Sequence, residues 1–225
     1  MDNIINKIEN LSIRNNSKAG GENTNKNGLL FEKNTSLEQY YTNVKDKKID
    51  KIIYKTISLN DSDIRLISFK HRNFHKYMIN KNYTNKDLLR LHGSKNPDEC
   101  YLNKKQKIIF IIEKKYQSIG GSVCEKLQTA PAKIWNYENL YTNYKIIYLY
   151  CLSQWFFENC KCELQYLDEC NIKYFNGDDK DYKLNIIKYI LSFFINLLLK
   201  LQLFLMLDSL NLLLDVPQSL QFYIP

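Results

Sequence analysis

Short apolar runs, each bounded by charged or polar residues, recur along the chain and predict the strands of a sheet. The clearest run is Ile108-Ile109-Phe110-Ile111-Ile112, which is short, β-branched and aromatic and therefore typical of a buried strand. Residues 144–152 (YKIIYLYCL) are apolar on both faces, so they predict a central strand. Residues 50–58 (DKIIYKTIS) predict another strand, and residues 173–175 predict an edge strand that the turn 176–179 closes.

Apolar residues at helical spacing predict helices between these strands. We expect helices over residues 2–13, 29–44 and 154–159, and a helix from Ser122 that Pro131 should kink or split. The helix over 29–44 would turn one face inward, formed by Leu30, Leu37, Tyr41 and Val44. The order of helix, strands, helix, strand, helix and strand predicts an α/β fold, with a mixed central sheet flanked by helices.

Charged residues at the two ends of a predicted hairpin suggest a catalytic site. Asp98 precedes one strand, and Glu113 and Lys115 stand at the end of the next, so the three can meet. Because side chains alternate along a strand, Glu113 and Lys115 share one face and Lys114 takes the other. Two carboxylates can hold Mg²⁺, and an ammonium can stabilise charge during phosphodiester hydrolysis. An ordinary turn and a solvated strand end would carry the same residue types.

The segment NPDECYLNKKQKIIFIIEKKYQ resembles the PD-(D/E)XK nuclease signature, with Pro97-Asp98 as its first half and Glu113-Lys114-Lys115 as its second. The helix and strand that follow resemble those of restriction-endonuclease-like members, so that the likeness extends over about residues 28–182. It implies a restriction-endonuclease-like core and Mg²⁺-dependent hydrolysis of DNA, as in a site-specific type II restriction endonuclease. Asp98 and Glu113 would bind the metal with the carbonyl of Lys114, while Lys115 would orient or activate the water.

The resemblance has further implications and leaves alternatives open. In that fold a helix before the hairpin sometimes lends an acid to the metal, which here would be Glu32; the helix dipole alone could also explain an acid at this place. Type II enzymes are commonly homodimers, because a palindromic site matches two-fold symmetry. One alternative is a structure-specific repair or recombination nuclease of the same fold. The other is an inactive, truncated or frameshifted relic that binds DNA.

A net charge of +8 suits a polyanionic partner, here double-stranded DNA. The side chains expected to contact that DNA are Lys126, Lys133, His71, Arg72 and His75. The abundance of Asn, Ile, Lys and Tyr can equally reflect an AT-rich genome, and the same basic residues can form solvated faces.

Three segments are expected: an N-terminal helix and polar loop over 1–27, the nuclease domain over 28–183 and an apolar tail over 184–225. The tail is a core or partner-facing helix, a membrane element or a shifted reading frame; Lys200 within its apolar run disfavours membrane insertion. The six cysteines are expected to be free thiols, although those at 160, 162 and 170 could belong to a zinc site. With no apolar signal segment at residues 1–16, the expected compartment is the cytoplasm.

Overall fold

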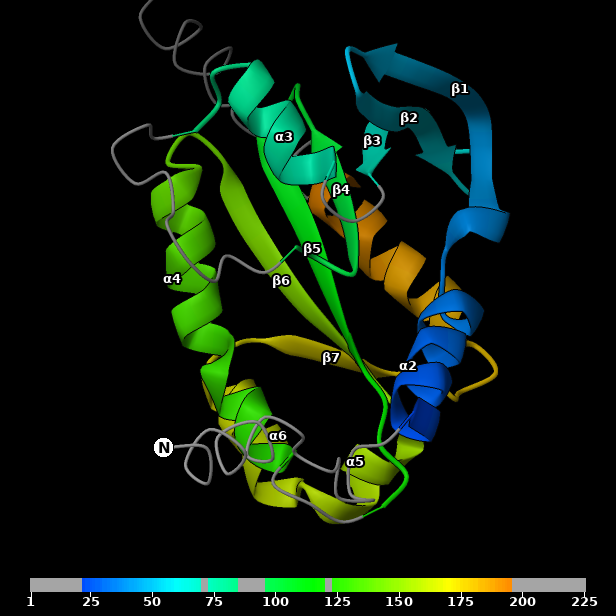
Figure 1. Cartoon of the computed structure of the whole chain (residues 1–225), viewed down its shortest axis with the longest axis vertical. Coiled ribbons are helices and arrows are strands. Elements are labelled where there is room, and N and C mark those ends of the chain that lie inside the picture. Colours follow the sequence, from blue (N-terminus) through cyan, green and yellow to red (C-terminus); the bar gives the residue numbers. More distant parts are fainter. Residues whose placement is uncertain (1–21, 70–72, 85–95, 120–122, 196–225) are drawn as a thin grey trace, which may run out of the picture. The chain divides into compact units, whose positions relative to one another are not determined.

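A mixed sheet of seven strands, in the order β1-β2-β3-β4-β5-β6-β7, forms the centre of the chain (Figure 1). The computed structural model describes residues 22–69, 73–84, 96–119 and 123–195. The strands are β1 (Tyr41–Ile49), β2 (Ile52–Leu59), β3 (Leu66–Phe69), β4 (Glu99–Asn103), β5 (Ile108–Lys115), β6 (Lys145–Leu152) and β7 (Lys173–Asn176). Neighbours pair antiparallel from β1 to β5, whereas β5, β6 and β7 are parallel. The α/β class and the mixed sheet are therefore as the sequence predicts.

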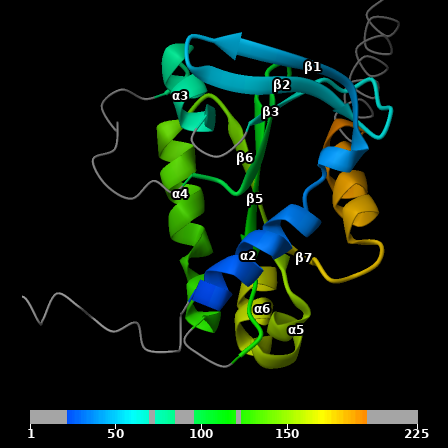
Figure 2. The same ribbon diagram turned by 45° about the vertical axis from the view of Figure 1, so that its right-hand side comes forward.

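Helices cover both faces of this sheet. They are α2 (Glu22–Asn34), α3 (Asn73–Asn80), α4 (Ala130–Leu140), α5 (Gln154–Asn159) and α6 (Lys161–Glu169), with 3-10 helices η1 (Glu38–Tyr40) and η3 (Cys124–Thr129). Side chains of α3 and α4 pack with Ile109 and Ile111 of β5 in one buried cluster. The Lys114 side chain leaves the opposite face of β5 and reaches α2. Figure 2 shows α4 beside the sheet and α2 crossing the end of β5.

The predicted central strands are confirmed, because β5 and β6 are buried along almost their whole length. Both faces of these strands pack against other elements, which explains why they are continuously apolar rather than alternating. The predicted strand over 50–58 is β2, and the predicted edge strand is β7, at one end of the sheet. Helix α5 has the predicted bounds.

The predicted helix over 29–44 is wrong. Helix α2 ends at Asn34, where the Thr35 hydroxyl donates to the carbonyl of Phe31 at 2.7 Å. The residues from Tyr41 onward instead form β1, which pairs with β2. The residues expected to form one inward face do not do so, because Leu37 is buried but Leu30 and Val44 are 54% and 44% exposed. The ladder with β1 satisfies the backbone groups along the edge of β2, which a continued helix could not have done.

Proline marks the beginning of a helix, as expected from its geometry. Pro131 lies in the first turn of α4, directly after η3, so the predicted split occurs. Ser122 and the predicted helix over 2–13 lie outside the described residues. Segment 60–80 contains β3 and α3.

The chain divides into two compact units, Met1–Leu184 and Asn185–Pro225, close to the boundary expected before the apolar tail. A helix occupies residues 182–195, and the rest of the tail lies outside the described residues. Within the part of the chain that is described, no helix has the length and apolar character needed to cross a membrane.

The expectation that all cysteines are free is wrong for two of them. Cys124 and Cys160 form a disulfide with a Cα–Cα distance of 5.5 Å. They stand far apart in the sequence, but the packing of α6 against η3 brings them together. Cys100, Cys151 and two further cysteines, at 162 and 170, are free.

Candidate functional site

The β4–β5 hairpin brings the predicted acids to one end of its two strands. Glu99, the first residue of β4, is paired with Ile112 of β5, so Asp98 lies beside the end of β5. There the backbone N–H of Lys114 donates to Asp98 Oδ2 at 2.7 Å. This bond fixes the Asp98 carboxylate against the strand that carries Glu113 and Lys115.

Two lysines converge on Glu113. The Nζ atoms of Lys115 and Lys133 lie 2.6 Å and 3.0 Å from the same oxygen, Glu113 Oε1. Lys115 comes from the end of β5, whereas Lys133 reaches over from α4 and lies 6.0 Å from the ring centre of Tyr150. Glu113 itself is buried. The pairing confirms that Glu113 and Lys115 share one face of β5.

The strand end that carries Lys115 is held by the next parallel strand. Ser153, which follows β6, donates its backbone N–H to the carbonyl of Lys115 at 3.0 Å. Its hydroxyl accepts from the N–H of Gln117 at 3.1 Å and donates to the Gln117 carbonyl at 3.0 Å. The backbone on both sides of the candidate lysine is therefore fixed by hydrogen bonds.

The two carboxylates differ in electrostatic environment. Burial, followed by repulsion from Glu113, raises the pKa of Asp98 to about 6. Burial acts in the same direction on Glu113, but the ammonium groups of Lys115 and Lys133 outweigh it and lower the pKa of that acid. Perturbed carboxylates that face each other are a common mark of functional sites, although structural ion pairs produce such shifts as well.

Glu32 lies near Asp98, where its negative charge also contributes to the raised pKa of that acid. Both line a pocket of about 510 Å³ whose lining includes Lys114. The helix that carries Glu32 approaches the sheet closely at Gly177, where a Cβ atom would lie 2.5 Å from Phe31. A glycine at this turn thus permits the position of α2. Glu32, the candidate third acid, thus shares a pocket with Asp98.

Lys114 contributes to a second polar cluster on the opposite face of β5. Its Nζ lies 2.6 Å from Glu99 Oε2, with side-chain exposures of only 3% and 7%, and donates to the carbonyl of Glu32 at 3.0 Å. Glu99 also accepts hydrogen bonds from the backbone of Leu37 and from the Tyr101 hydroxyl. Sequence reasoning missed the role of Glu99, although this acid stands directly beside Asp98.

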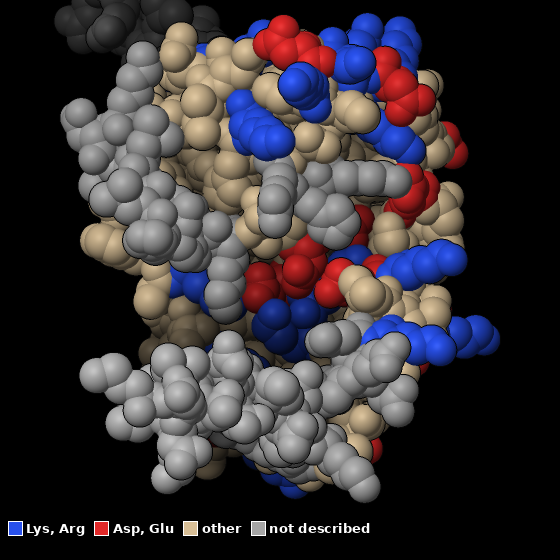
Figure 3. Space-filling view, in the orientation of Figure 1, with Lys and Arg blue, Asp and Glu red and all other residues tan. Residues whose placement is uncertain are grey.

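The predicted DNA-contacting residues have different surroundings in the structure. Lys126 is exposed on η3, whereas Lys133 points to Glu113 rather than away from the site. His75 is hydrogen-bonded to the Tyr141 hydroxyl and stacks on Tyr137, so its ring packs against α4. His71 and Arg72 lie outside the described residues. Acidic and basic side chains nevertheless gather near the middle of the face that Figure 3 presents.

The donor set is suited to Mg²⁺, because hard divalent cations prefer carboxylate oxygens. Asp98 and Glu113 are close enough for their charges to repel, and both lysine contacts of Glu113 go to one of its two oxygens. In the described part of the chain, oxygens of Asp98, Glu113 and Glu32 are not all within 4.8 Å of one another. The three acids therefore do not form one compact group, although the charges of Glu113 and Glu32 both act on Asp98.

Comparison of the chain with protein-family models, with curated proteins and with solved structures finds no match.

Proposed function

We propose that this chain is a Mg²⁺-dependent DNA endonuclease with a restriction-endonuclease-like core. One observation carries the proposal: the Lys114 N–H holds Asp98 at the end of β5, where Lys115 Nζ lies 2.6 Å from Glu113 Oε1. Two acids at this strand end, with a lysine two residues after the second, make the arrangement that the PD-(D/E)XK resemblance implies. The parallel strand β6, joined to β5 through η3 and α4, also agrees with the helix and strand of that resemblance.

Each residue of the site has a distinct part in the proposed reaction. Asp98 and Glu113 would hold Mg²⁺, which lowers the pKa of a bound water and polarises the scissile phosphate. Lys115 orients the attacking water and stabilises the negative charge that develops on the phosphate. Lys133, the second ammonium at Glu113, keeps that acid ionised. Ionised Glu113 is the form needed for metal binding.

The substrate in this proposal is double-stranded DNA cleaved at a specific site, as in type II restriction. A homodimer would match a palindromic site by two-fold symmetry. The net charge of +8 supports a polyanionic substrate, since neutralising phosphates releases counterions and favours binding.

Plasmid digestion tests the proposal directly. Purified protein is incubated with supercoiled plasmid in Mg²⁺, in Mn²⁺ and in a chelator, together with the Asp98→Asn and Glu113→Gln variants. We expect discrete fragments with wild type and Mg²⁺ only, while both variants still bind DNA in a gel-shift assay. A matched control is Glu125→Gln, because this acid is exposed on η3.

The other outcomes separate the alternatives. Nicks confined to branched or flapped DNA would replace restriction with a repair nuclease of the same fold. Cleavage that survives in both acid variants would assign the activity to a contaminant. Intact DNA with Mg²⁺ and Mn²⁺ would overturn the nuclease proposal and leave DNA binding alone.

A further inference from the structure

A second group of possible metal ligands lies outside the proposed nuclease site. Within the described residues, Cys124, Cys160 and Glu163 form the group whose ligand atoms, two sulfurs and a carboxylate oxygen, all lie within 4.8 Å of one another. Cys124 begins η3, Cys160 lies between α5 and α6, and Glu163 is in the first turn of α6. Two segments 36 residues apart in the sequence, at Cys124 and at Cys160–Glu163, therefore place two soft donors and one hard donor together.

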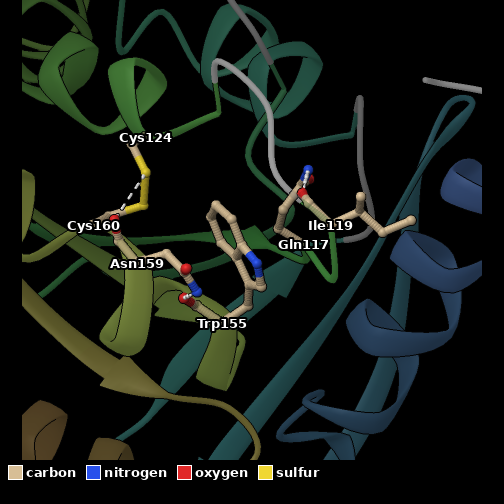
Figure 4. Close-up of a disulfide and its surroundings, with 6 residues drawn as sticks. All are labelled: Gln117, Ile119, Cys124, Trp155, Asn159 and Cys160. Atoms are coloured by element: carbon tan, nitrogen blue, oxygen red, sulfur yellow. Dashed lines mark hydrogen bonds between the residues drawn. A yellow bond between two sulfur atoms is a disulfide. The ribbon is translucent and has the colours of Figure 1, made fainter.

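The two sulfurs are joined as a disulfide in the structure. Figure 4 shows this bond beside α5, with Cys124 Sγ 3.9 Å from the carbonyl oxygen of Asn159. Cys160 is fully buried within the cluster that includes Leu127 and Leu164. Besides the disulfide, the packing of α6 against η3 holds together the segments that carry the two cysteines.

Two of the three donors lie at the beginning of one helix. Cys160 directly precedes α6, whose first turn holds Glu163, so both lie at the positive end of the helix dipole. Two thiolates and a carboxylate leave the fourth position of a tetrahedral zinc ion to water.

We propose that the Cys124–Cys160–Glu163 group binds one Zn²⁺ ion when its disulfide is reduced. A dithiol supplies two electrons and two protons, breaks the S–S bond and becomes a cyclic disulfide itself. Zn²⁺ then displaces both thiol protons and binds the two sulfurs, Glu163 and a water. The sulfurs must separate to about 3.8 Å, as tetrahedral geometry with zinc–sulfur bonds of about 2.3 Å requires. This site shares no residue with Asp98, Glu113 or Lys115.

Metal titration of the reduced and oxidised full-length protein tests the proposal. The protein is reduced, freed of metal and titrated with Zn²⁺ against a chromophoric chelator, and with Co²⁺ by absorption spectroscopy. We expect one Zn²⁺ per reduced chain, a thiolate-to-cobalt charge-transfer band and neither signal for the oxidised protein. The charge-transfer band requires sulfur ligands, so it separates this site from carboxylates that bind Co²⁺.

Three variants locate the ion. Cys124→Ser should remove the charge-transfer band or shift it strongly. Glu163→Gln, which leaves both cysteines and the disulfide in place, should weaken Zn²⁺ binding by at least about tenfold, the loss that even an outer-shell partner produces. Cys162→Ser is the matched control, because this free cysteine is exposed on the same helix and outside the group. Absence of Zn²⁺ binding by reduced wild type, or equal affinity in Glu163→Gln and wild type, would overturn the proposal.

Discussion

Replacing Asp98 with asparagine should stabilise the metal-free protein while abolishing its proposed activity. The raised pKa of Asp98 means that its charged form is less favourable in the folded than in the unfolded chain. Asparagine has nearly the same shape and keeps an oxygen that can accept from the Lys114 N–H. The substitution therefore removes the unfavourable charge without removing the hydrogen bond.

The expected size follows from the pKa. The difference between the ordinary value of 3.8 and about 6 corresponds to about 3 kcal/mol of unfolding free energy, a shift in which the attraction of Lys115 is already included. For a chain of this size that is a rise in melting temperature of about 6–12 °C. The gain is complete above about pH 6, where folded Asp98 is ionised, and it disappears as the pH falls toward 3.8.

Thermal unfolding of wild type and Asp98→Asn from pH 3.5 to 8, with and without Mg²⁺, measures this effect. Asp63→Asn is the matched control, because Asp63 is exposed and should change little. Mg²⁺ should raise the melting temperature of wild type but not of Asp98→Asn, since only a bound ion stabilises the fold by mass action. The electrostatic reasoning fails if Asp98→Asn is less stable than wild type above pH 7, or if the difference between the two does not vary with pH.

Four lysines provide further tests. Lys115→Ala should slow cleavage by about 10²–10³, the usual loss for one charge stabiliser, with DNA affinity in a gel-shift assay nearly unchanged. Lys114→Ala should cost about 3–5 kcal/mol in denaturant unfolding, because it leaves Glu99 buried without its partner; a loss below about 1 kcal/mol would contradict the buried pair. Lys133→Ala should move the acid limb of the pH–rate profile to higher pH, because Lys133 lowers the pKa of Glu113. Lys126→Ala should leave that limb in place. If Lys126 contacts a phosphate, its removal should only flatten the slope of log affinity against log salt concentration, by about 0.9.

The hairpin was predictable because two independent patterns agreed. The apolar run of β5 indicated a strand buried on both faces, and the charges at its end had to alternate between those faces. That alternation separates the Lys115–Glu113 pair from the Lys114–Glu99 pair. Sequence patterns were therefore sufficient here, because one strand, β5, carries both the buried apolar residues and the charged residues of the candidate site.

Strand β1 was not predictable by the same rules. Its sequence, YTNVKDKKI, is mostly polar, and its residues are half-buried or exposed, so it carries no inward-facing apolar pattern. It is a strand because β2 offers a backbone ladder to its edge, which is a tertiary effect. The Cys124–Cys160 pair escaped prediction for a similar reason, since only the packing of α6 against η3 brings the two together.

Lys133 shows how helical spacing can mislead about a long side chain. It lies three residues after Ala130 and four before Tyr137, both buried, so it stands on the inward side of α4. The charge of this side chain predicts that it lies in solvent. A lysine can, however, lay its methylenes along apolar surface and direct its ammonium to a partner. Here the partner is Glu113, whose buried carboxylate would otherwise be costly. The buried acid that we predict as a metal ligand thus explains why this lysine faces inward.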